Sequence, residues 1–445
     1  MESAVFHRSL EKTYPTAVRG EGIYLIDQSG KRILDGSSGA AVSSVGHGHA
    51  DVIEAIISQA RKMAFAHTSF FTSDPAEALA RTIIDKSDGA FTHITFLSSG
   101  SEAVESSIKM TRQYHIYNGE PGRVNFIGRM YAYHGNTLGA LAAGNNPQRR
   151  AAFTEMLGPS FHHVSRCFYD ADGAGLTEQE YEDRLIVELE DKVNSLGPET
   201  VAGVIVEPVG GATLGSVPAT TTYLPRLKEL CSRHGILVIF DEVMCGLGRV
   251  GSYHAWQSLG GVPPDLQTIG KGLAAGYQPL SGVLINENVY KVFEKYSKGA
   301  NKFVSGHTYQ GHAIGCAAAL AVQQVIERDN LVDNVSRRGS LLAMTLEEGL
   351  PATFRECGGT LRGMGLFRTV DFGKLGEKIG HGVLMQRVAD ECFERGAAVY
   401  VCSSAVDAIL IAPPFTVSQD EIIELANIVI ASLDAVLKRS ERSQL

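Results

Sequence analysis

The sequence predicts an α/β protein, with a larger domain built on a mainly parallel sheet and a smaller α+β domain. Short apolar runs alternate with amphipathic segments from about residue 90 to residue 320, which is the pattern of a parallel sheet covered by helices. Gly, Ser or Pro follows each apolar run. Ligands of such sheets bind at the carboxyl ends of the strands, so the polar residues there are the first candidates for function.

The larger domain is expected to span residues 61–325, and residues 1–60 are expected to join residues 326–445 in the smaller domain. Near the N-terminus, YLIDQSGKRILDG places a turn between two apolar runs and predicts a hairpin. The strands expected in the larger domain are 93–97, 123–127, 203–207, 236–240, 266–269 and 282–285.

Composition and charge exclude several classes of function. The formal net charge is −9 and no run of Lys and Arg exceeds two residues, so binding to nucleic acid or to anionic lipid is not expected. No apolar stretch approaches the ~18 residues of a membrane span, and a cytoplasmic protein acting on small molecules is expected. The seven cysteines are scattered without a CxxC pair, which favours reduced thiols over disulfides or a structural metal.

The segment LVIFDEVMCGLGRVG at 237–251 has two competing interpretations. In the first, Gly246, Gly248 and Gly251 form a dinucleotide-phosphate loop. That interpretation is disfavoured, because two carboxylates at the end of the apolar run would repel a pyrophosphate and no long helix follows the glycines. In the second, the glycines only turn the chain, and Asp241 is a fixed anion in the crevice where ligands of such sheets bind.

A fixed anion at that position needs a cationic partner, and Lys271 is the candidate. It follows the run at 266–269, stands between Gly270 and Gly272, and lies in a segment with almost no charge. A lysine among glycines is commonly exposed to solvent. A buried lysine with a lowered pKa is instead what imine chemistry requires.

A candidate anion site follows the first strand, where ITFL leads into SSGSEAVESSIKMTRQY. Ser98 or Ser99 can cap a helix that Gly100 and Ser101 open, and the free N–H groups and dipole at that end favour an anion. The alternative is an ordinary capped helix.

Six segments occur together in register: SGSEA, YHGNT, VEPVGG, FDEVMCGLGRVG, IGKG and HTYQGHAIGCAAAL. In order and spacing, over most of the chain, they resemble the class III aminotransferases, which are pyridoxal-phosphate enzymes of fold type I. The resemblance implies a seven-stranded sheet in the larger domain, pyridoxal 5'-phosphate as cofactor, and a homodimer with active sites at its interface.

The resemblance also implies roles for single residues. Lys271 matches the Schiff-base lysine, which moves a proton between substrate and cofactor. Asp241 matches the carboxylate that pairs with the pyridine nitrogen. Tyr133 and Val243 match the residues on the two faces of the ring.

Five further positions match the same motifs. Gly100 and Ser101 match the turn that cradles the phosphate. Thr308 matches a threonine that reaches the phosphate from the neighbouring subunit. His134 and Glu207 are expected to support the cofactor site from behind its direct contacts.

The sequence departs from the members that use glutamate or 2-oxoglutarate. Their carboxylate-binding arginine is replaced by Leu410, the glutamate that gates it by Ala212, and a nearby glutamine by Met244. The pattern is more similar to amine or ω-amino acid:pyruvate transaminases. Some of those use a mobile arginine, for which the candidates are Arg149, Arg150, Arg166 and Arg395.

The predicted function is therefore a ping-pong transamination from a primary amine or ω-amino acid to a keto acid, with pyruvate as the expected acceptor. A racemase or epimerase, or a 2-oxoglutarate-using aminotransferase, remains an alternative. A decarboxylase of the same family fits poorly, because its special glutamine and tryptophan fall at Ala40 and Tyr133. A non-catalytic or NAD-binding protein is disfavoured, since Lys271 and Asp241 are both present. The sequence leaves the amine donor open.

Overall fold

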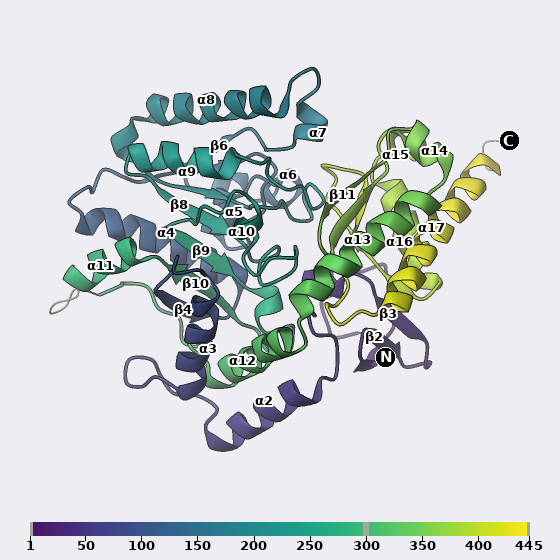
Figure 1. The fold of residues 1–445 in the computed structure, drawn as a ribbon, viewed down its shortest axis with the longest axis horizontal. Helices are drawn as coiled ribbons and strands as arrows, with labels where there is room; N and C mark the ends of the chain where they lie inside the picture. Colours follow the sequence, from purple (N-terminus) through teal and green to yellow (C-terminus); the bar gives the residue numbers. More distant parts are fainter. Residues whose placement is uncertain (1–2, 297–301, 443–445) are drawn as a thin grey trace.

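A seven-stranded sheet forms the centre of the larger part of the computed structural model, which describes residues 3–296 and 302–442 (Figure 1). The strand order is β4-β10-β9-β8-β7-β5-β6. Strand β10 runs antiparallel to both of its neighbours and the other pairs are parallel, which confirms the predicted mainly parallel sheet. Its strands are β4 (His93–Leu97), β5 (Asn125–Arg129), β6 (Phe161–Val164), β7 (Val201–Val206), β8 (Leu237–Asp241), β9 (Leu266–Ile269) and β10 (Ser281–Ile285).

Helices cover both faces of this sheet, and strand β8 shows the reason. Leu237 and Ile239 pack into one apolar cluster, whereas Val238 and Phe240 point to the opposite face and pack into another. The helices of this part are α2 (Ala50–Lys62), α3 (Asp74–Asp85), α4 (Gly100–Tyr117), α5 (Leu138–Ala143), α6 (Pro147–Arg150), α7 (Tyr169–Asp172), α8 (Glu178–Leu196), α9 (Tyr223–Arg233), α10 (Ala255–Ser258), α11 (Glu287–Tyr296) and α12 (Ala313–Arg328).

The six predicted strands are all present, and two differences from the prediction are informative. The second strand begins at Asn125 rather than Arg123, and the buried Arg123 guanidinium donates to the carbonyls of Pro198, Val201 and His234. The sequence interpretation missed β6, which pairs only with β5 at the edge of the sheet. Its sequence, FHHV, places two half-buried histidines between its apolar ends, so it lacks the continuous apolar run of the other strands.

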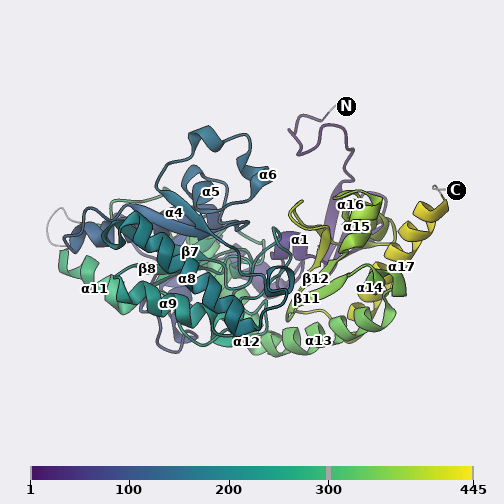
Figure 2. The ribbon, with the colours of Figure 1, turned by 90° about the horizontal axis from the view of Figure 1, so that it is seen from above.

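The smaller part combines segments from both ends of the chain, as Figure 2 shows. Two four-stranded sheets, β1-β2-β3-β13 and β11-β12-β15-β14, share one apolar cluster with the C-terminal helices. The antiparallel pair β2–β3 confirms the predicted hairpin. The domain limits at residues 60 and 325 stay a prediction. The elements are β1 (Ala17–Glu21), β2 (Tyr24–Asp27), β3 (Arg32–Asp35), α1 (Ser38–Ala41), α13 (Leu331–Gly349), α14 (Ala352–Glu356), β11 (Thr360–Met364), β12 (Phe367–Asp371), α15 (Lys374–Ile379), α16 (Val383–Glu394), β13 (Ala397–Ala398), β14 (Tyr400–Val401), β15 (Ala408–Ile411) and α17 (Gln419–Arg442).

All seven cysteines are buried and carry free thiols. Within residues 3–296 and 302–442, no helix is long and apolar enough to cross a membrane. The same residues contain no group of three or more His, Cys, Asp or Glu side chains that could hold a metal ion.

Candidate active site

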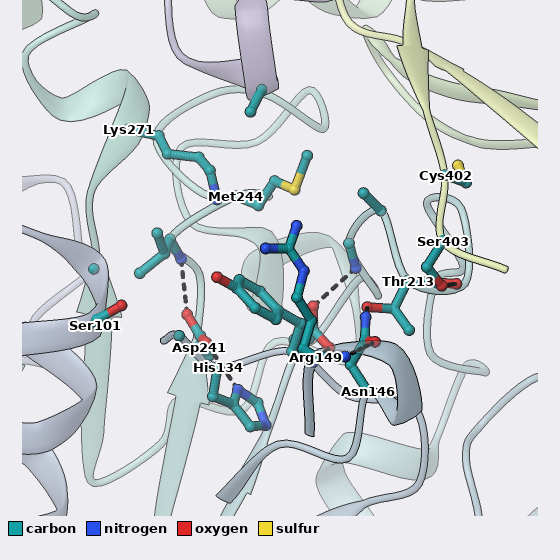
Figure 3. Close-up of a pocket in the computed structure, with 18 of the residues that line it drawn as sticks. Ser101, His134, Asn146, Arg149, Thr213, Asp241, Met244, Lys271, Cys402 and Ser403 are labelled. Carbon is teal, nitrogen blue, oxygen red and sulfur yellow. Dashed lines mark hydrogen bonds and ion pairs between the residues drawn. The ribbon is translucent and has the colours of Figure 1, made fainter. Parts of the chain in front are cut away.

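A cavity of about 380 Å³ lies at the carboxyl end of the central sheet, and its outer wall comes from the smaller part (Figure 3). This volume is within the range of ~300–1,000 Å³ that is typical of small-molecule sites. Eight of the nine predicted site residues line it: Gly100, Ser101, Tyr133, His134, Glu207, Asp241, Val243 and Lys271. The ninth, Thr308, does not line the cavity and is exposed in a turn.

Asp241 ends strand β8 and is held by three donors. Its Oδ1 accepts from the Val243 amide at 3.1 Å and from Thr268 Oγ1 at 2.9 Å. Its Oδ2 lies 2.8 Å from His134 Nδ1. Facing a carboxylate, that imidazole nitrogen carries the proton and donates. The carboxylate, with its residue 5% exposed, is therefore fixed in orientation.

Lys271 lies just beyond strand β9, and its side chain is partly accessible because it borders the cavity. Burial lowers the pKa of its amine, and the nearby Asp241 carboxylate opposes this shift. Its backbone φ is +43°, a left-handed value that is uncommon for a residue with a side chain. Backbone strain of this kind concentrates at functional positions.

Helix α4 presents its N-terminus to the cavity, as predicted. Ser99 is the N-cap, and its hydroxyl accepts from the Glu102 amide at 3.3 Å. Gly100 allows a close approach to Val243, because a Cβ at this position would lie 2.7 Å from a methyl carbon of Val243. Ser101 Oγ accepts from the Asn136 amide at 2.9 Å, which joins the helix start to the YHGNT segment. Gly246 and Gly248 lie in turns and Gly251 lies in a bend, as the second interpretation of that segment expects of its glycines.

Glu207 supports the backbone around the cavity. Its carboxylate accepts from the Gly211 amide at 2.8 Å and from the Tyr133 amide at 3.3 Å. Burial raises the pKa of this carboxyl group. Burial also raises the pKa of the Tyr133 phenol, whose ring lies 5.7 Å from the Arg149 guanidinium.

Of the four candidate arginines, only Arg149 lines the cavity. Arg150 donates to the Gly144 carbonyl at 2.6 Å. Arg166 pairs with Asp172 at 2.8 Å, and Arg395 pairs with Glu391 at 2.9 Å.

The three positions at which the sequence differs from the glutamate-using members do not all lie at the cavity. Ala212 and Met244 line the cavity. Leu410 lies on β15 with no exposed surface and packs into the apolar core instead.

The sequence interpretation missed several residues around the cavity. Thr268 lies opposite Asp241 on the adjacent strand, a register that becomes visible only in the folded sheet. Asn146, Thr213 and Ser403 form a polar wall that no motif indicates. Arg8 also lines the cavity, although residues 3–16 show no periodic pattern.

The family model described as aminotransferase class-III matches residues 5–433 of the chain. The diaminobutyrate–2-oxoglutarate transaminase of Halomonas elongata is 32% identical, over 91% of this chain and 87% of its own. The putrescine–pyruvate aminotransferase of Pseudomonas aeruginosa is 29% identical, over 95% of this chain and 91% of its own. The crystal structure of the omega transaminase from Pseudomonas jessenii in complex with PMP is 29% identical, with a TM-score of 0.90 over 96% of this chain and 94% of that chain.

Class III aminotransferases depend on pyridoxal phosphate, and the residues of this cavity fit that group. A lysine amine with a lowered pKa, a buried and oriented carboxylate, and a helix N-terminus are all at its wall. These groups suit an aldehyde, a protonated ring nitrogen and a phosphate respectively. The chain therefore belongs to the class III aminotransferases, and it is a pyridoxal-phosphate-dependent transaminase.

Proposed function

We propose that the enzyme transfers an amino group from a primary amine or an ω-amino acid to pyruvate by a ping-pong sequence. In such a sequence the donor and the acceptor occupy one cavity in turn. The observation that carries the proposal is that Lys271 borders the cavity that Asp241, Met244 and Ala212 also line. The name of the putrescine–pyruvate relative supports the choice of acceptor.

When bound, pyridoxal phosphate supplies an aldehyde that reacts with amines and a ring that draws electrons from the adjacent carbon. We assign to Lys271 the transfer of a proton to and from that substrate carbon. Because burial lowers the pKa of Lys271, a larger fraction of its amine is neutral and able to accept a proton. Asp241, oriented by three donors, is assigned to keep the ring nitrogen protonated.

The remaining predicted residues are assigned to bind and orient the cofactor. Gly100 and Ser101 at the start of α4 offer backbone N–H groups for the phosphate. Tyr133 and Val243 are assigned to the two faces of the ring. His134 and Glu207 hold Asp241 and the Tyr133 backbone in place.

We further propose that the enzyme works as a homodimer in which Thr308 completes the neighbouring site. Its exposure in this chain leaves it free to contact a second copy. A cytoplasmic location is also proposed, because seven buried free thiols suit a reducing compartment.

The choice of pyruvate over 2-oxoglutarate rests on side chains at the cavity. Ala212 and Met244 bring no charge, and Leu410, in the position of the glutamate-binding arginine, is buried in the apolar core. A glutamate carboxylate left without that partner would lose about 2 to 5 kcal/mol of binding free energy. The alternative acceptor is 2-oxoglutarate, which the name of the Halomonas relative favours.

The first test is the visible absorption spectrum of the purified enzyme. A yellow band that bleaches with 1-phenylethylamine or β-alanine, and returns with pyruvate, is the expected result. If the yellow band returns with 2-oxoglutarate but not with pyruvate, the acceptor is 2-oxoglutarate instead of pyruvate. If neither amine changes the yellow band, primary amines and ω-amino acids are ruled out as donors.

The second test is Lys271→Ala, which should abolish turnover while the variant still binds pyridoxal phosphate. Binding is expected to survive in part because the phosphate and ring contacts do not involve this amine. Turnover at the wild-type rate in this variant would end the assignment of Lys271.

A further inference from the structure

The charges around the cavity are not balanced locally. Its lining contains two arginines, Arg8 and Arg149, the Lys271 amine, and two carboxylates, Glu207 and Asp241. The Asp241 carboxylate accepts from His134, Val243 and Thr268, and that of Glu207 accepts from two backbone amides. Neither acid forms an ion pair within 4.0 Å with Arg8 or Arg149.

Arg149 is a cavity-lining cation without an acidic partner in the described part of the chain. Among the described residues, no carboxylate lies within 4.0 Å of its guanidinium, whereas Arg166 and Arg395 both have acidic partners. Its guanidinium lies 5.7 Å from the centre of the Tyr133 ring. Figure 3 shows the Arg149 side chain extending into the space between α6 and Met244.

The backbone that carries Arg149 is firmly anchored. Asn146 caps helix α6 by accepting from the Arg149 amide at 3.2 Å, and its own amide group donates to Thr213 Oγ1 at 3.1 Å. On the other side, the Gln148 side chain accepts from the Ser404 amide at 3.3 Å. The arginine is thus presented from a fixed turn that contacts both parts of the protein.

We propose that Arg149, with Arg8 also lining the cavity, is the carboxylate-binding site of this cavity, so that the enzyme selects amino acids and keto acids over uncharged amines. The inference rests on the proposed function and decides between its two donor classes. A guanidinium offers a planar pair of N–H donors that matches a carboxylate. The polar wall of Asn146, Thr213 and Ser403 beside it suits a hydrated, charged group better than an aryl or alkyl group.

The geometry explains how one cavity can serve both half-reactions. Lys271 and Arg149 reach the same space from different elements, the segment after β9 and helix α6. A substrate with its amino or keto group near Lys271 and its carboxylate near Arg149 makes both contacts at once. The ω-amino acid donor and the keto acid acceptor share that pair of groups, and a simple amine lacks one of them.

The experiment compares donors that differ only in the carboxylate, in single half-reactions followed by absorbance. β-Alanine is paired with propylamine, and 4-aminobutyrate with butylamine. In the wild-type enzyme the carboxylate member of each pair should have the lower KM. In Arg149→Gln the KM ratio should shift against the carboxylate member by about tenfold, as expected for a charged hydrogen bond that is partly open to solvent.

Two further variants separate charge from structure. Arg149→Lys keeps the positive charge without the planar guanidinium. Its KM ratios should lie between those of wild type and Arg149→Gln. Arg387→Gln removes an exposed arginine from helix α16, away from the cavity, and should leave every ratio unchanged. A binding measurement independent of turnover is the spectrophotometric titration of the holoenzyme with propionate, whose Kd should rise in Arg149→Gln.

The outcomes are distinct. The inference is overturned if Arg149→Gln raises the KM of both members of each pair by the same factor, or changes the KM of neither. Wild-type preference for the uncharged amines would also overturn it, while leaving the proposed transaminase in place. If the wild-type enzyme reacts with none of the four donors, the proposed donor classes fail and this inference fails with them.

Discussion

His134 Nδ1 lies 2.8 Å from Asp241 Oδ2 in a contact that is almost completely buried. Together with Thr268 and the Val243 amide, it gives the Asp241 carboxylate three donors on its two oxygens. The contact therefore makes His134 a positioning residue for the group that is proposed to hold the cofactor ring.

Replacing His134 by Ala should weaken cofactor binding, because Asp241 then loses one of its donors. A buried hydrogen bond to a charged group contributes about 1.5 to 3 kcal/mol, so the Kd for pyridoxal phosphate should rise about tenfold or more. Titration of the apoenzyme by absorbance measures this. His134→Asn places an amide donor near the position of Nδ1 and should restore part of the affinity. Equal affinities in all three proteins would contradict the role.

Gly100 and Val243 should show coupled effects on stability. Gly100→Ala places a Cβ 2.7 Å from a methyl carbon of Val243, and overpacking of this kind costs about 1 to 3 kcal/mol. Val243→Ala removes that methyl group, so the double variant should recover much of the loss caused by Gly100→Ala. Chemical denaturation of the four proteins gives the coupling free energy. Gly122→Ala is the control, since the added Cβ has only one neighbour, at 3.9 Å. If the two single changes in the free energy of unfolding simply add in the double variant, the clash between Gly100→Ala and Val243 is ruled out.

Glu242 should make stability depend on pH. Burial raises the pKa of its carboxyl group to about 8, from an ordinary value of 4.5. Between these values the folded protein holds a proton that the unfolded chain releases, so this contribution to stability is full below pH 4.5 and lost as the pH rises through 8. Glu242→Gln does not titrate, but it loses one acceptor for the Ala255 and Trp256 amides. The variant should be less stable than wild type at pH 5, with a gap in Tm that narrows towards pH 9. A constant gap would show that Glu242 keeps an ordinary pKa.

Thr308 can be tested by mixing two inactive variants. Lys271→Ala lacks the amine that is proposed to react, and Thr308→Asp places a negative charge where the proposed neighbouring phosphate binds. In a mixed dimer, the subunit with Lys271 receives Thr308 from its partner, so one site is complete. Activity should appear after co-refolding or co-expression, although each variant alone is inactive. If Thr308 acts within its own subunit, the mixture stays inactive.

The sequence predicted the strand ends of the site because apolar runs and the residues behind them can be read locally. Asp241 and Lys271 both follow such runs, and the parallel pairing of β8 and β9 brings them to one edge. The role of Thr268 depends on the register between those two strands, which local patterns do not encode. The antiparallel direction of β10 was equally invisible, since a short buried run such as SGVLI has the same pattern in either direction.

The site residues outside the motifs could not be predicted from the sequence, for a different reason. Arg8 comes to the cavity through a segment without regular structure, and its position depends on long-range packing. For the four candidate arginines, the decisive property was whether an acidic or carbonyl partner lay nearby. Only the fold distinguishes Arg149 from Arg166 and Arg395 in this respect.

The cavity wall is assembled from segments that a ribosome makes at very different times. Arg8 is synthesised before Lys271, and Cys402 and Ser403 are synthesised after it. A nascent chain can complete the central sheet before these last wall residues exist. The cavity wall is therefore complete only after Ser403 has been synthesised, and a chain that stops before β14 would leave Lys271 open to solvent on that side.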